Sequence, residues 1–445
     1  MKFTFDEIVK ATGATILQCL NTSGTFAVST DSRTINADDV YLPLVGENFD
    51  GHNFIESALE KGARGYFTSD KNKVDLSAKF VLYVEDTLIA YLKLASFYRE
   101  KVNPVVIAIT GSSGKTTTKE MMYSVAKQAF RTHKSILNHN NEVGLCQTML
   151  GMPQDTEVLV VEMGMRGLGE IELLAKYAKP DIAIVANTGT AHIGRLGSVE
   201  NIAKAKCEVT KHLNPEGLFL AHDTALIRAA NTFVGKTVYL GLNAADLVDL
   251  ALNESSCDFV YKNQEYKINV EGAHNIQNSL FVINAALKLG MKSELIAAGL
   301  GEYRPIEKRW EVSSVSGFKV INDSYNSNPE SVRAAICAFL ATQKPPRTLV
   351  LGDMGELGKD EKNYHLEVGK YLKDNFYEFS LITVGKLAKY IARGMAGSTD
   401  KIAVSLPTNK EAAKYILENV PVGTTMLFKA SRSMKFEEII KELQK

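Results

Sequence analysis

Short apolar runs recur through the middle of the chain, and longer segments with the spacing of amphipathic helices separate them. Continuous runs of this length are typical of strands that are buried on both faces in a parallel sheet. Strands that alternate with helices in this way predict a doubly wound, mostly parallel α/β sheet. The predicted strands are Val105–Thr110, Val158–Met163, Ile182–Asn187 and Gly217–Ala221.

A second series of the same kind fills the C-terminal part of the chain. A helix is predicted over Pro329–Ala341, because proline suits the first position of a helix. The alternation predicts a Rossmann-like α/β domain that begins within about ten residues of position 313. Its predicted strands are FKVIND, TLVLGD, LITVG and TTMLFKAS.

The first part of the chain mixes short strands and helices, which predicts a small α/β domain. Strands are expected at Asp39–Leu44 and Gly65–Thr68, with a helix over Asn53–Lys61 between them. A helix over Thr87–Glu100 leads into the central domain, and the alternating stretch Cys257–Glu271 predicts antiparallel strands added to that domain. We therefore expect three domains, over residues 1–85, 86–313 and 314–445.

Composition narrows the class of protein. The chain has 445 residues, of which 45% are hydrophobic and 23% charged, as in soluble globular proteins. Lys+Arg and Asp+Glu number 51 each, which argues against a nucleic-acid partner or a broad anionic-membrane surface. No apolar run approaches the ~20 residues of a membrane span, and the start MKFTFDEIVK lacks the apolar core of a signal peptide. Five scattered cysteines without a CxxC pair predict free thiols, so we expect a cytoplasmic protein.

The strongest chemical signal is a Gly/Ser-rich turn that follows the first central strand and opens a helix. Its glycines let the backbone wrap a phosphate, and successive N–H groups at a helix start attract the anion. The lysine can neutralise phosphate charge, and the following hydroxyl can bind Mg²⁺. Ile109 stands where the strict GxxxxGK[ST] motif has glycine, and a plain turn is the bland alternative. The loop comprises Thr110, Gly111, Ser112, Ser113, Gly114, Lys115, Thr116 and Thr117.

Two further side chains follow strands of the same predicted sheet. Glu162 ends the strand VLVVEM, and His192 lies just after the strand IAIVAN. Ligands bind outside the carboxyl ends of such strands, so both side chains are candidate metal ligands beside the loop. A surface carboxylate and an ordinary loop histidine remain the alternatives.

Lys206 occupies an unusual position on a predicted helix. If Ser198–Leu213 is helical, then Ile202 and Val209 belong to one apolar stripe, and Lys206 lies inside that stripe. A lysine on an inward face must extend its amine to solvent, find a partner or change its chemistry.

Three polar clusters allow two interpretations each. Asn275, at the start of a long helical segment, could contact a nucleotide or cap the helix. Arg309 could contact a nucleotide or form a surface salt bridge. The loop from Asp323 to Pro329 could bind a ligand or be a turn with asparagine caps.

These motifs together resemble the ATP-dependent Mur ligase family of peptidoglycan synthesis, over essentially the whole chain. TGSSGKTTT is similar to the family's ATP loop, and His274-Asn275, Arg309 and Asp323 to its nucleotide contacts. The segment AKAKCE is similar to the family's modified-lysine region. The resemblance implies ATP, two Mg²⁺ ions and a CO₂-derived carbamate on Lys206. It also implies catalytic roles for Lys115, Glu162, His192 and Lys206, with Thr116, Glu162, His192 and Lys206 as metal ligands.

Within the family, DSYNSNP, LGDMGELG and KASRSM resemble the members that add D-alanyl-D-alanine to a UDP-N-acetylmuramoyl-tripeptide through an acyl phosphate. Ala430 departs from the glycine usual at its position. The resemblance implies that the first domain binds the uridine nucleotide, the central domain ATP and the last domain the dipeptide. We expect a monomer. The implied substrate-binding residues are Asp31, Ser32, Arg33, Asn138, Asn141, Tyr325, Asn326, Asn328 and Arg432.

Two alternatives remain. Another ligase of the superfamily, such as a folylpolyglutamate synthetase or the tripeptide-forming ligase, would share the loop but not the TDSR and DSYNSNP segments. A regulatory P-loop ATPase or switch would bind partners without ligating anything, and a GTPase would need an NKxD-type motif, which the sequence lacks.

Overall fold

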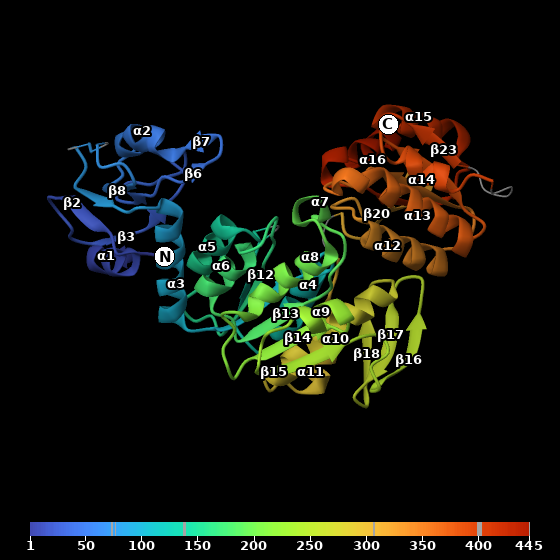
Figure 1. The fold of residues 1–445 in the computed structure, drawn as a ribbon, viewed down its shortest axis with the longest axis horizontal. Helices are drawn as coiled ribbons and strands as arrows, with labels where there is room; N and C mark the ends of the chain where they lie inside the picture. The colour runs from blue at the N-terminus through green and yellow to red at the C-terminus, as the bar shows by residue number, and fades with distance from the viewer. Residues whose placement is uncertain (73, 76, 137–138, 306–307, 398–402, 445) are drawn as a thin grey trace. The chain divides into compact units, whose positions relative to one another are not determined.

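The computed structural model describes residues 1–444 except residues 73, 76, 137–138, 306–307 and 398–402 (Figure 1). The chain divides into two compact units. The first comprises Met1–Val106, Arg131–Met163 and Leu173–Lys179, and the second comprises Ile107–Phe130, Gly164–Glu172 and Pro180–Lys445. The predicted domain boundaries at residues 85 and 313 stay predictions.

A five-stranded sheet organises the start of the first unit. Its order is β2 (Thr15–Cys19), β9 (Phe80–Tyr83), β8 (Gly65–Thr68), β5 (Val40–Tyr41) and β4 (Val28–Ser29), all parallel except β2. The prediction of β8 is confirmed, but the strand predicted over Asp39–Leu44 shrinks to β5. The Asp39 carboxylate accepts a hydrogen bond from Asn36 N at 3.1 Å in the preceding turn, and Pro43 cannot donate to a ladder.

The remaining elements of the first unit complete its layers. The helix predicted over Asn53–Lys61 starts instead as a 3₁₀ turn, η1 (Gly51–Phe54), and continues as α2 (Ile55–Glu60). The Asp50 carboxylate caps that turn by accepting from His52 N at 2.9 Å. The other elements are β1 (Phe3–Thr4), α1 (Phe5–Thr12), β3 (Thr25–Phe26), β6 (Val45–Gly46), β7 (Phe49–Asp50), α3 (Thr87–Val102), β11 (Thr132–Lys134), α5 (Glu142–Gly151) and β12 (Val158–Glu162).

Parallel strands begin the second unit, as the apolar runs predict. β10 (Val105–Thr110) pairs with β13 (Ile182–Val185), which is followed in the sheet by β14 (Leu218–His222) and β15 (Lys236–Leu240). The helix α4 (Lys115–Ala126), which opens at the Gly/Ser-rich loop, packs against α10 (Ala273–Lys288) and α11 (Ser293–Glu302). Other elements here are α7 (Ile193–Leu196), α8 (Val199–Cys207), η2 (Glu208–Thr210) and α9 (Ala225–Ala230), and the unit boundary after Glu172 divides α6 (Glu170–Ala178).

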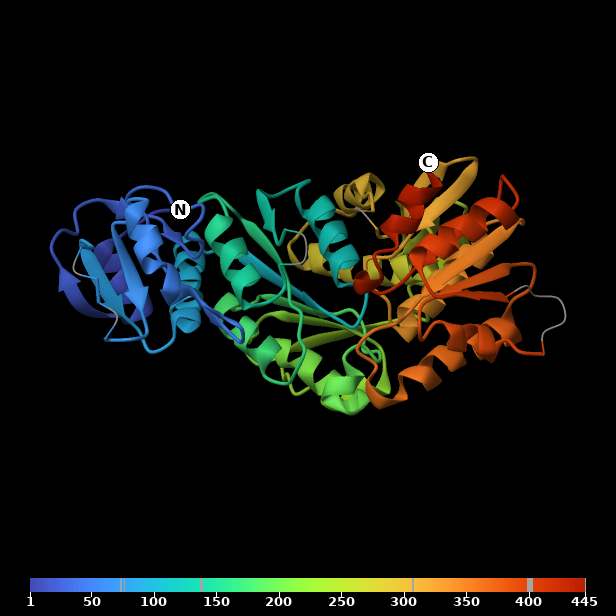
Figure 2. The ribbon, with the colours of Figure 1, turned by 90° about the horizontal axis from the view of Figure 1, so that it is seen from above.

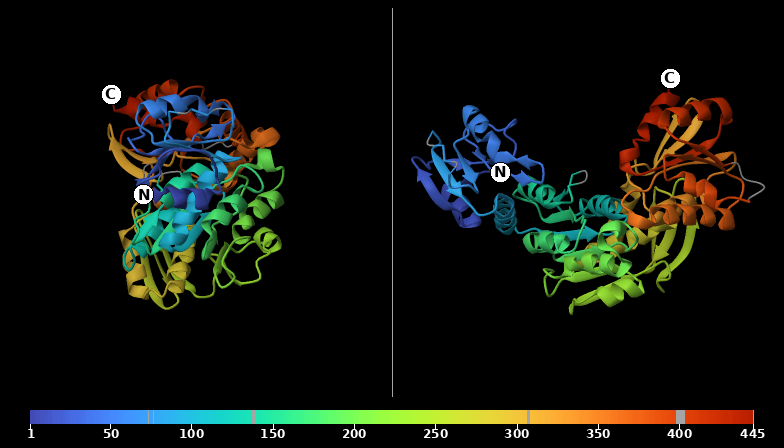
Figure 3. Two further views of the ribbon diagram at one scale, coloured as in Figure 1. Left: turned by 90° about the vertical axis from the view of Figure 1, so that its left-hand side faces the viewer. Right: turned by 45° about the horizontal axis from the view of Figure 1, so that its top comes forward.

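A small antiparallel sheet, yellow in Figures 1 and 3, is attached to this part of the second unit. It consists of β16 (Leu247–Leu252), β17 (Cys257–Tyr261) and β18 (Gln264–Ile268) in that order. The antiparallel strands predicted over Cys257–Glu271 are therefore confirmed.

The C-terminal part of the second unit is a six-stranded sheet with helices on its two sides (Figure 2). The residues of one face pack with α15 and α16 into a core that includes Val350, Ile382 and Phe428. The expected Rossmann-like fold is confirmed, and the predicted helix is α12 (Pro329–Thr342). The strand order is β19 (Glu311–Val315), β20 (Phe318–Asn322), β24 (Thr425–Lys429), β21 (Arg347–Gly352), β22 (Ser380–Val384) and β23 (Ala403–Leu406). The other helices are η3 (Gly358–Asp360), α13 (Glu361–Asn375), α14 (Lys389–Gly394), α15 (Asn409–Asn419), η4 (Arg432–Met434) and α16 (Glu437–Leu443).

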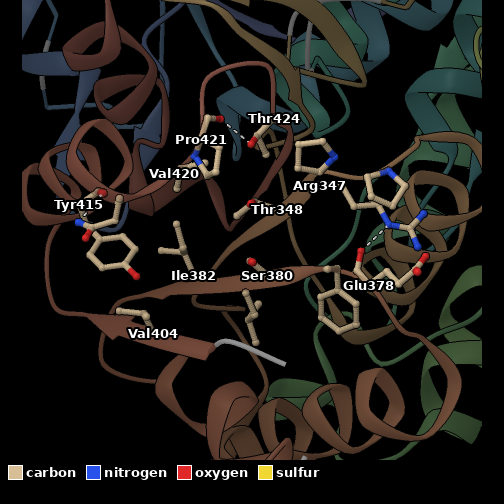
Figure 4. Close-up of a pocket in the computed structure, with 15 residues that line it drawn as sticks. Arg347, Thr348, Glu378, Ser380, Ile382, Val404, Tyr415, Val420, Pro421 and Thr424 are labelled. Carbon is tan, nitrogen blue, oxygen red and sulfur yellow. Dashed lines mark hydrogen bonds between the residues drawn. The ribbon is translucent and has the colours of Figure 1, made fainter. Parts of the chain in front are cut away.

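A hollow of about 530 Å³ lies at the amino ends of β21 and β22 (Figure 4). Tyr415 and Val404 lie on one side of it, and Arg347 and Glu378 on the other. Arg347 Nε donates to Glu378 O at 3.0 Å, and the other guanidinium nitrogens donate to the carbonyl oxygens of Leu340, Gln343 and Tyr377. This arginine therefore fastens chain segments together.

Trp310, the single tryptophan, directly precedes β19, where the chain enters the C-terminal sheet. Its side chain is 7% exposed, and its backbone is left-handed (φ 61°).

All five cysteines are free thiols, as predicted. Among the described residues, no helix is long and apolar enough to cross a membrane.

Candidate functional site

The Gly/Ser-rich loop joins β10 to α4 with the geometry of a phosphate-binding loop. Gly114 takes a left-handed conformation (φ 77°) as the residue that starts α4, and no side chain caps the helix there. A helix start directs its first N–H groups along the helix axis, which suits an anion at this end of α4. A Cβ at Gly114 would also lie 2.8 Å from Asn278 Oδ1, so glycine is required for space as well as for conformation.

Two groups that sequence reasoning did not single out hold the loop in shape. Asn187, two residues past the end of β13, accepts from Ser113 N at 2.9 Å and donates to Ser113 Oγ at 2.8 Å. Gly189 N donates to Ser112 Oγ at 2.9 Å. The position of Asn187 at the carboxyl edge of the same sheet is the signal that could have identified it.

Lys115 and Lys206 lie close enough to interact. Lys115 Nζ donates to Gly111 O at 2.7 Å, which holds its ammonium against the loop. Lys206 is only 2% exposed on α8, as its place in the apolar stripe predicts, whereas Lys204 and Lys211 are exposed. Burial lowers the pKa of Lys206 well below its usual value, and the charge of Lys115 lowers it further. Both effects act against the ammonium form of Lys206.

The helix that carries Lys206 is shorter than the predicted span Ser198–Leu213. It starts after the cap Ser198 and changes to the 3₁₀ turn η2 at Glu208. The Glu208 carboxylate accepts from Gly169 N at 2.8 Å and from Glu172 N at 3.4 Å, and so caps the start of α6. This contact involves residues far away in the chain, so helical periodicity could not predict it.

His192 lies next to these two lysines. It has a left-handed backbone (φ 66°), and its Nδ1 lies 2.6 Å from Glu356 Oε2. Burial lowers the pKa of His192, the Glu356 carboxylate raises it, and Lys206 and Lys115 lower it. The structure thus brings together three of the four predicted catalytic side chains around the loop.

Glu162 belongs to the first unit, where it ends β12. It is 2% exposed, and its Oε1 accepts from Asn140 Nδ2 at 3.0 Å. Asn141 caps α5 by accepting from Gly144 N at 3.0 Å. Asn138 lies outside the described residues.

The segment before α10 carries His274 and Asn275. Asn275 does not cap the helix with its side chain, because its Nδ2 donates to Glu271 O at 2.6 Å. His274 Nε2 lies 3.2 Å from the same Nδ2. Burial lowers the pKa of His274 to about 4, while Asp323 raises it and Lys429 lowers it.

The loop between β20 and α12 is fastened by a buried lysine that sequence reasoning missed. Lys429 Nζ donates to Asp323 Oδ2 at 2.7 Å and to Asn326 O at 3.1 Å. Asn328 caps α12 by accepting from Ser331 N at 2.8 Å, and its Nδ2 donates to Ser112 O at 3.4 Å. The capping interpretation of Asn328 is therefore correct, and the residue also contacts the phosphate-binding loop.

Two arginines flank this loop. The Arg309 guanidinium lies 4.1 Å from the centre of the Tyr325 ring, an arrangement that favours a cation–π contact. Arg432 Nη1 donates to Glu437 Oε1 at 2.6 Å, and Lys308 Nζ donates to the same oxygen at 3.2 Å.

The predicted uridine-nucleotide residues lie in the first unit, after β4. Arg33 donates to both carboxylate oxygens of Asp31, at 2.9 and 2.8 Å. These hydrogen bonds lower the pKa of Asp31 to about 2. Ser32 is buried, and its carbonyl accepts from Lys61 Nζ at 2.9 Å.

The described side chains around the phosphate-binding loop do not form a preformed metal cage. Across the part of the chain that the structure describes, no cluster of three or more His, Cys, Asp or Glu side chains could hold a metal ion. The buried hydroxyls of Thr110 and Thr188 make no hydrogen bond within the described residues. Mg²⁺ bound largely through substrate phosphates and water needs no such cage.

The loop and its parallel sheet define a P-loop nucleotide-binding enzyme of the α/β class, with a second α/β sheet in the same chain. Three family descriptions match consecutive parts: the Mur ligase family catalytic domain (residues 26–106), the Mur ligase middle domain (109–286) and the Mur ligase glutamate ligase domain (308–432). The chain belongs to the Mur ligase family.

Full-length relatives support this assignment. The UDP-N-acetylmuramoyl-tripeptide–D-alanyl-D-alanine ligase of Bacillus subtilis is 38% identical over 94% of this chain and 92% of its own. The Escherichia coli enzyme of the same name is 30% identical over 94% and 93%. A crystal structure of MurF from Acinetobacter baumannii superposes with a TM-score of 0.92 at 29% identity, over 100% and 99% of the chains. MurF ligase from Thermotoga maritima in complex with ADP superposes with a TM-score of 0.84 at 27% identity, over 94% and 97%.

Proposed function

We propose that this chain joins D-alanyl-D-alanine to a UDP-N-acetylmuramoyl-tripeptide at the expense of ATP, as a cytoplasmic monomer in peptidoglycan synthesis. The observation that carries the proposal is the full-length similarity to ligases of that name, at 38% identity for the Bacillus subtilis enzyme. The phosphate-binding loop and the buried Lys206 beside it supply the matching chemistry.

The reaction forms one amide bond in two transfers. A carboxylate oxygen of the tripeptide attacks the γ-phosphorus of ATP, and the bond to the β-phosphate oxygen breaks, giving an acyl phosphate and ADP. The amine of D-alanyl-D-alanine then attacks the acyl carbon, loses a proton, and inorganic phosphate leaves. The protein aligns these groups and neutralises their negative charge. Lys115 and the start of α4 would do this at the transferring phosphate, and the hydrogen bond from Lys115 Nζ to Gly111 O supports this role.

The proposal includes Mg²⁺, which suits the phosphate oxygens of ATP. Thr116, Glu162, His192 and a carbamate on Lys206 would hold two ions, which would neutralise phosphate charge when bound. The structural support is the burial of Lys206, which lowers the pKa of its amine well below the usual value. A neutral amine adds CO₂ and releases one proton to give a carbamate, which removes a buried potential cation and supplies two oxygen ligands.

The remaining predicted residues receive binding roles in this proposal. The nucleotide of ATP would be contacted by Asn275, Arg309 and Asp323. The UDP-tripeptide would be contacted by Asp31, Ser32, Arg33 and Asn141. The dipeptide would be contacted by Arg432 and by the loop that carries Tyr325, Asn326 and Asn328. The Arg309 guanidinium lies 4.1 Å from the centre of the Tyr325 ring, and both are planar groups that can contact an aromatic base or a peptide plane.

A substrate panel tests the function. The purified chain is mixed with ATP, Mg²⁺, D-alanyl-D-alanine and a UDP-tripeptide that ends in either lysine or diaminopimelate. We expect phosphate release that depends on both substrates, together with a UDP-pentapeptide detected by mass spectrometry. ATP hydrolysis that is indifferent to the dipeptide would instead indicate a regulatory ATPase.

A further inference from the structure

The segment after β13 contacts two carboxylates from the C-terminal part of the chain, within the second unit. Thr190 Oγ1 donates to Glu330 Oε2 at 3.0 Å, in the first turn of α12. Glu356, from the loop after β21, contacts the segment twice. Its carbonyl accepts from Gly194 N at 3.3 Å, and its carboxylate lies 2.6 Å from His192 Nδ1.

The charges around His192 make the second contact informative. Lys206 and Lys115 both act on the ring as positive neighbours, and the Glu356 carboxylate is the opposing negative charge. The carboxylate at Nδ1 orients the ring and leaves Nε2 as the ring nitrogen that it does not contact. Histidines that bind metal ions usually have such a partner on the other nitrogen, and it fixes both ring orientation and tautomer.

We propose that Glu356 is the positioning residue of His192: it holds the ring with Nε2 available for Mg²⁺, and only while the 356–358 segment is docked on the 190–194 segment. This inference rests on the proposed function. Completion of the metal site would thereby depend on a carboxylate that lies 164 positions further along the chain.

A pair of glycines makes the docking possible. A Cβ at Gly194 would lie 2.6 Å from Gly358 N and 2.7 Å from Gly358 Cα. Gly194 does not have a positive φ, so alanine there suits its own backbone, and the three atoms nearest to the new Cβ all belong to the docked segment. Gly194→Ala is therefore a wedge that separates the two segments without altering either His192 or Glu356.

The first experiment compares Glu356→Ala and Glu356→Gln with the wild-type protein. Many metal-binding histidines contact a carboxylate or carbonyl through the ring nitrogen that does not bind the metal. Removing that group typically weakens metal binding or activity by ~10–100-fold. We expect Glu356→Ala to lose kcat in this range with little change in the KM of the UDP-tripeptide. Glu356→Gln should lose less, because its amide oxygen can still lie against Nδ1.

The second readout does not need turnover. Mn²⁺ is titrated into the protein with a non-hydrolysable ATP analogue, and free Mn²⁺ is followed by electron paramagnetic resonance. We expect weaker Mn²⁺ binding in Glu356→Ala and in Gly194→Ala, by ~10-fold or more. Matched controls are Glu367→Gln, a glutamate that is equally exposed at 51% and pairs with Lys370, and Gly301→Ala, where the new Cβ meets nothing closer than 3.9 Å.

The outcomes separate the inference from the proposed function. A wild-type protein that makes no pentapeptide refutes the function. If it does make pentapeptide, and Glu356→Ala keeps wild-type kcat and Mn²⁺ affinity, Glu356 does not position His192. If Ala and Gln variants lose only thermal stability, with both readouts unchanged, the contact is merely structural and the inference is also wrong.

Discussion

The buried position of His274 leads us to predict that the folded protein loses stability in mild acid. Its pKa is lowered to about 4 from the usual 6.5, because burial disfavours the imidazolium and Lys429 repels it, more than Asp323 offsets. In the unfolded chain the histidine regains its ordinary pKa, so the folded state binds fewer protons. His274 therefore contributes fully to stability above pH 6.5, and this contribution is lost as the pH falls from 6.5 towards 4.

The magnitude follows from the size of the shift. A difference of about 2.5 pKa units corresponds to ~3.4 kcal/mol, at ~1.4 kcal/mol per unit. The side chain is partly exposed, so solvent screening reduces the expected effect to roughly 2–3 kcal/mol. Between pH 7.5 and pH 5, the linkage relation predicts that roughly 1.5–2 kcal/mol of it disappears.

Urea unfolding of wild type and His274→Gln, followed by circular dichroism at several pH values, measures this loss. Other histidines titrate in both proteins, so the difference between the two unfolding free energies isolates His274. We expect wild type to lose about 1.5–2 kcal/mol more than the variant between pH 7.5 and pH 5. The exposed His212, replaced in His212→Gln, is the control and should follow wild type. Parallel pH profiles for wild type and His274→Gln would refute the reasoning.

Three further predictions concern the site. Lys115→Ala and Glu162→Ala should abolish ligation with unchanged circular dichroism, since both remove charges needed at the phosphates; wild-type turnover in either folded variant contradicts their roles. Lys206→Ala should be nearly inactive, and acetate should partly restore activity by replacing the carbamate; normal activity without acetate would exclude a carbamate role. Asn326→Ala should raise the KM of the dipeptide more than that of ATP, whereas Asn328→Ala should in addition lower stability by about 1 kcal/mol in thermal unfolding, because it removes a helix cap. Equal KM changes for both substrates would point to a collapsed loop.

The parts of this molecule that periodicity governs could be predicted from the sequence. The ends of β10 were predicted to the residue, and the burial of Lys206 followed from its place in one apolar stripe. Both depend on short-range order, which a single segment encodes.

The features that could not be predicted from the sequence depend on contacts between residues far apart in the chain. Glu208 ends the helix of Lys206 by capping α6, and Lys429 fastens a loop that lies 103–106 positions earlier. The pairing of His192 with Glu356 also needs the fold before it can be seen. No local pattern distinguishes such residues from ordinary surface charges.

Trp310 gives the protein an optical property of its own. As the single indole, buried where the chain passes into the C-terminal sheet, it can be excited selectively despite 17 tyrosines. Its emission wavelength reflects the polarity around one known position, so an unlabelled sample carries its own fluorophore at this junction. Stopped-flow mixing with nucleotide or dipeptide can thus time local rearrangements there without any engineered dye.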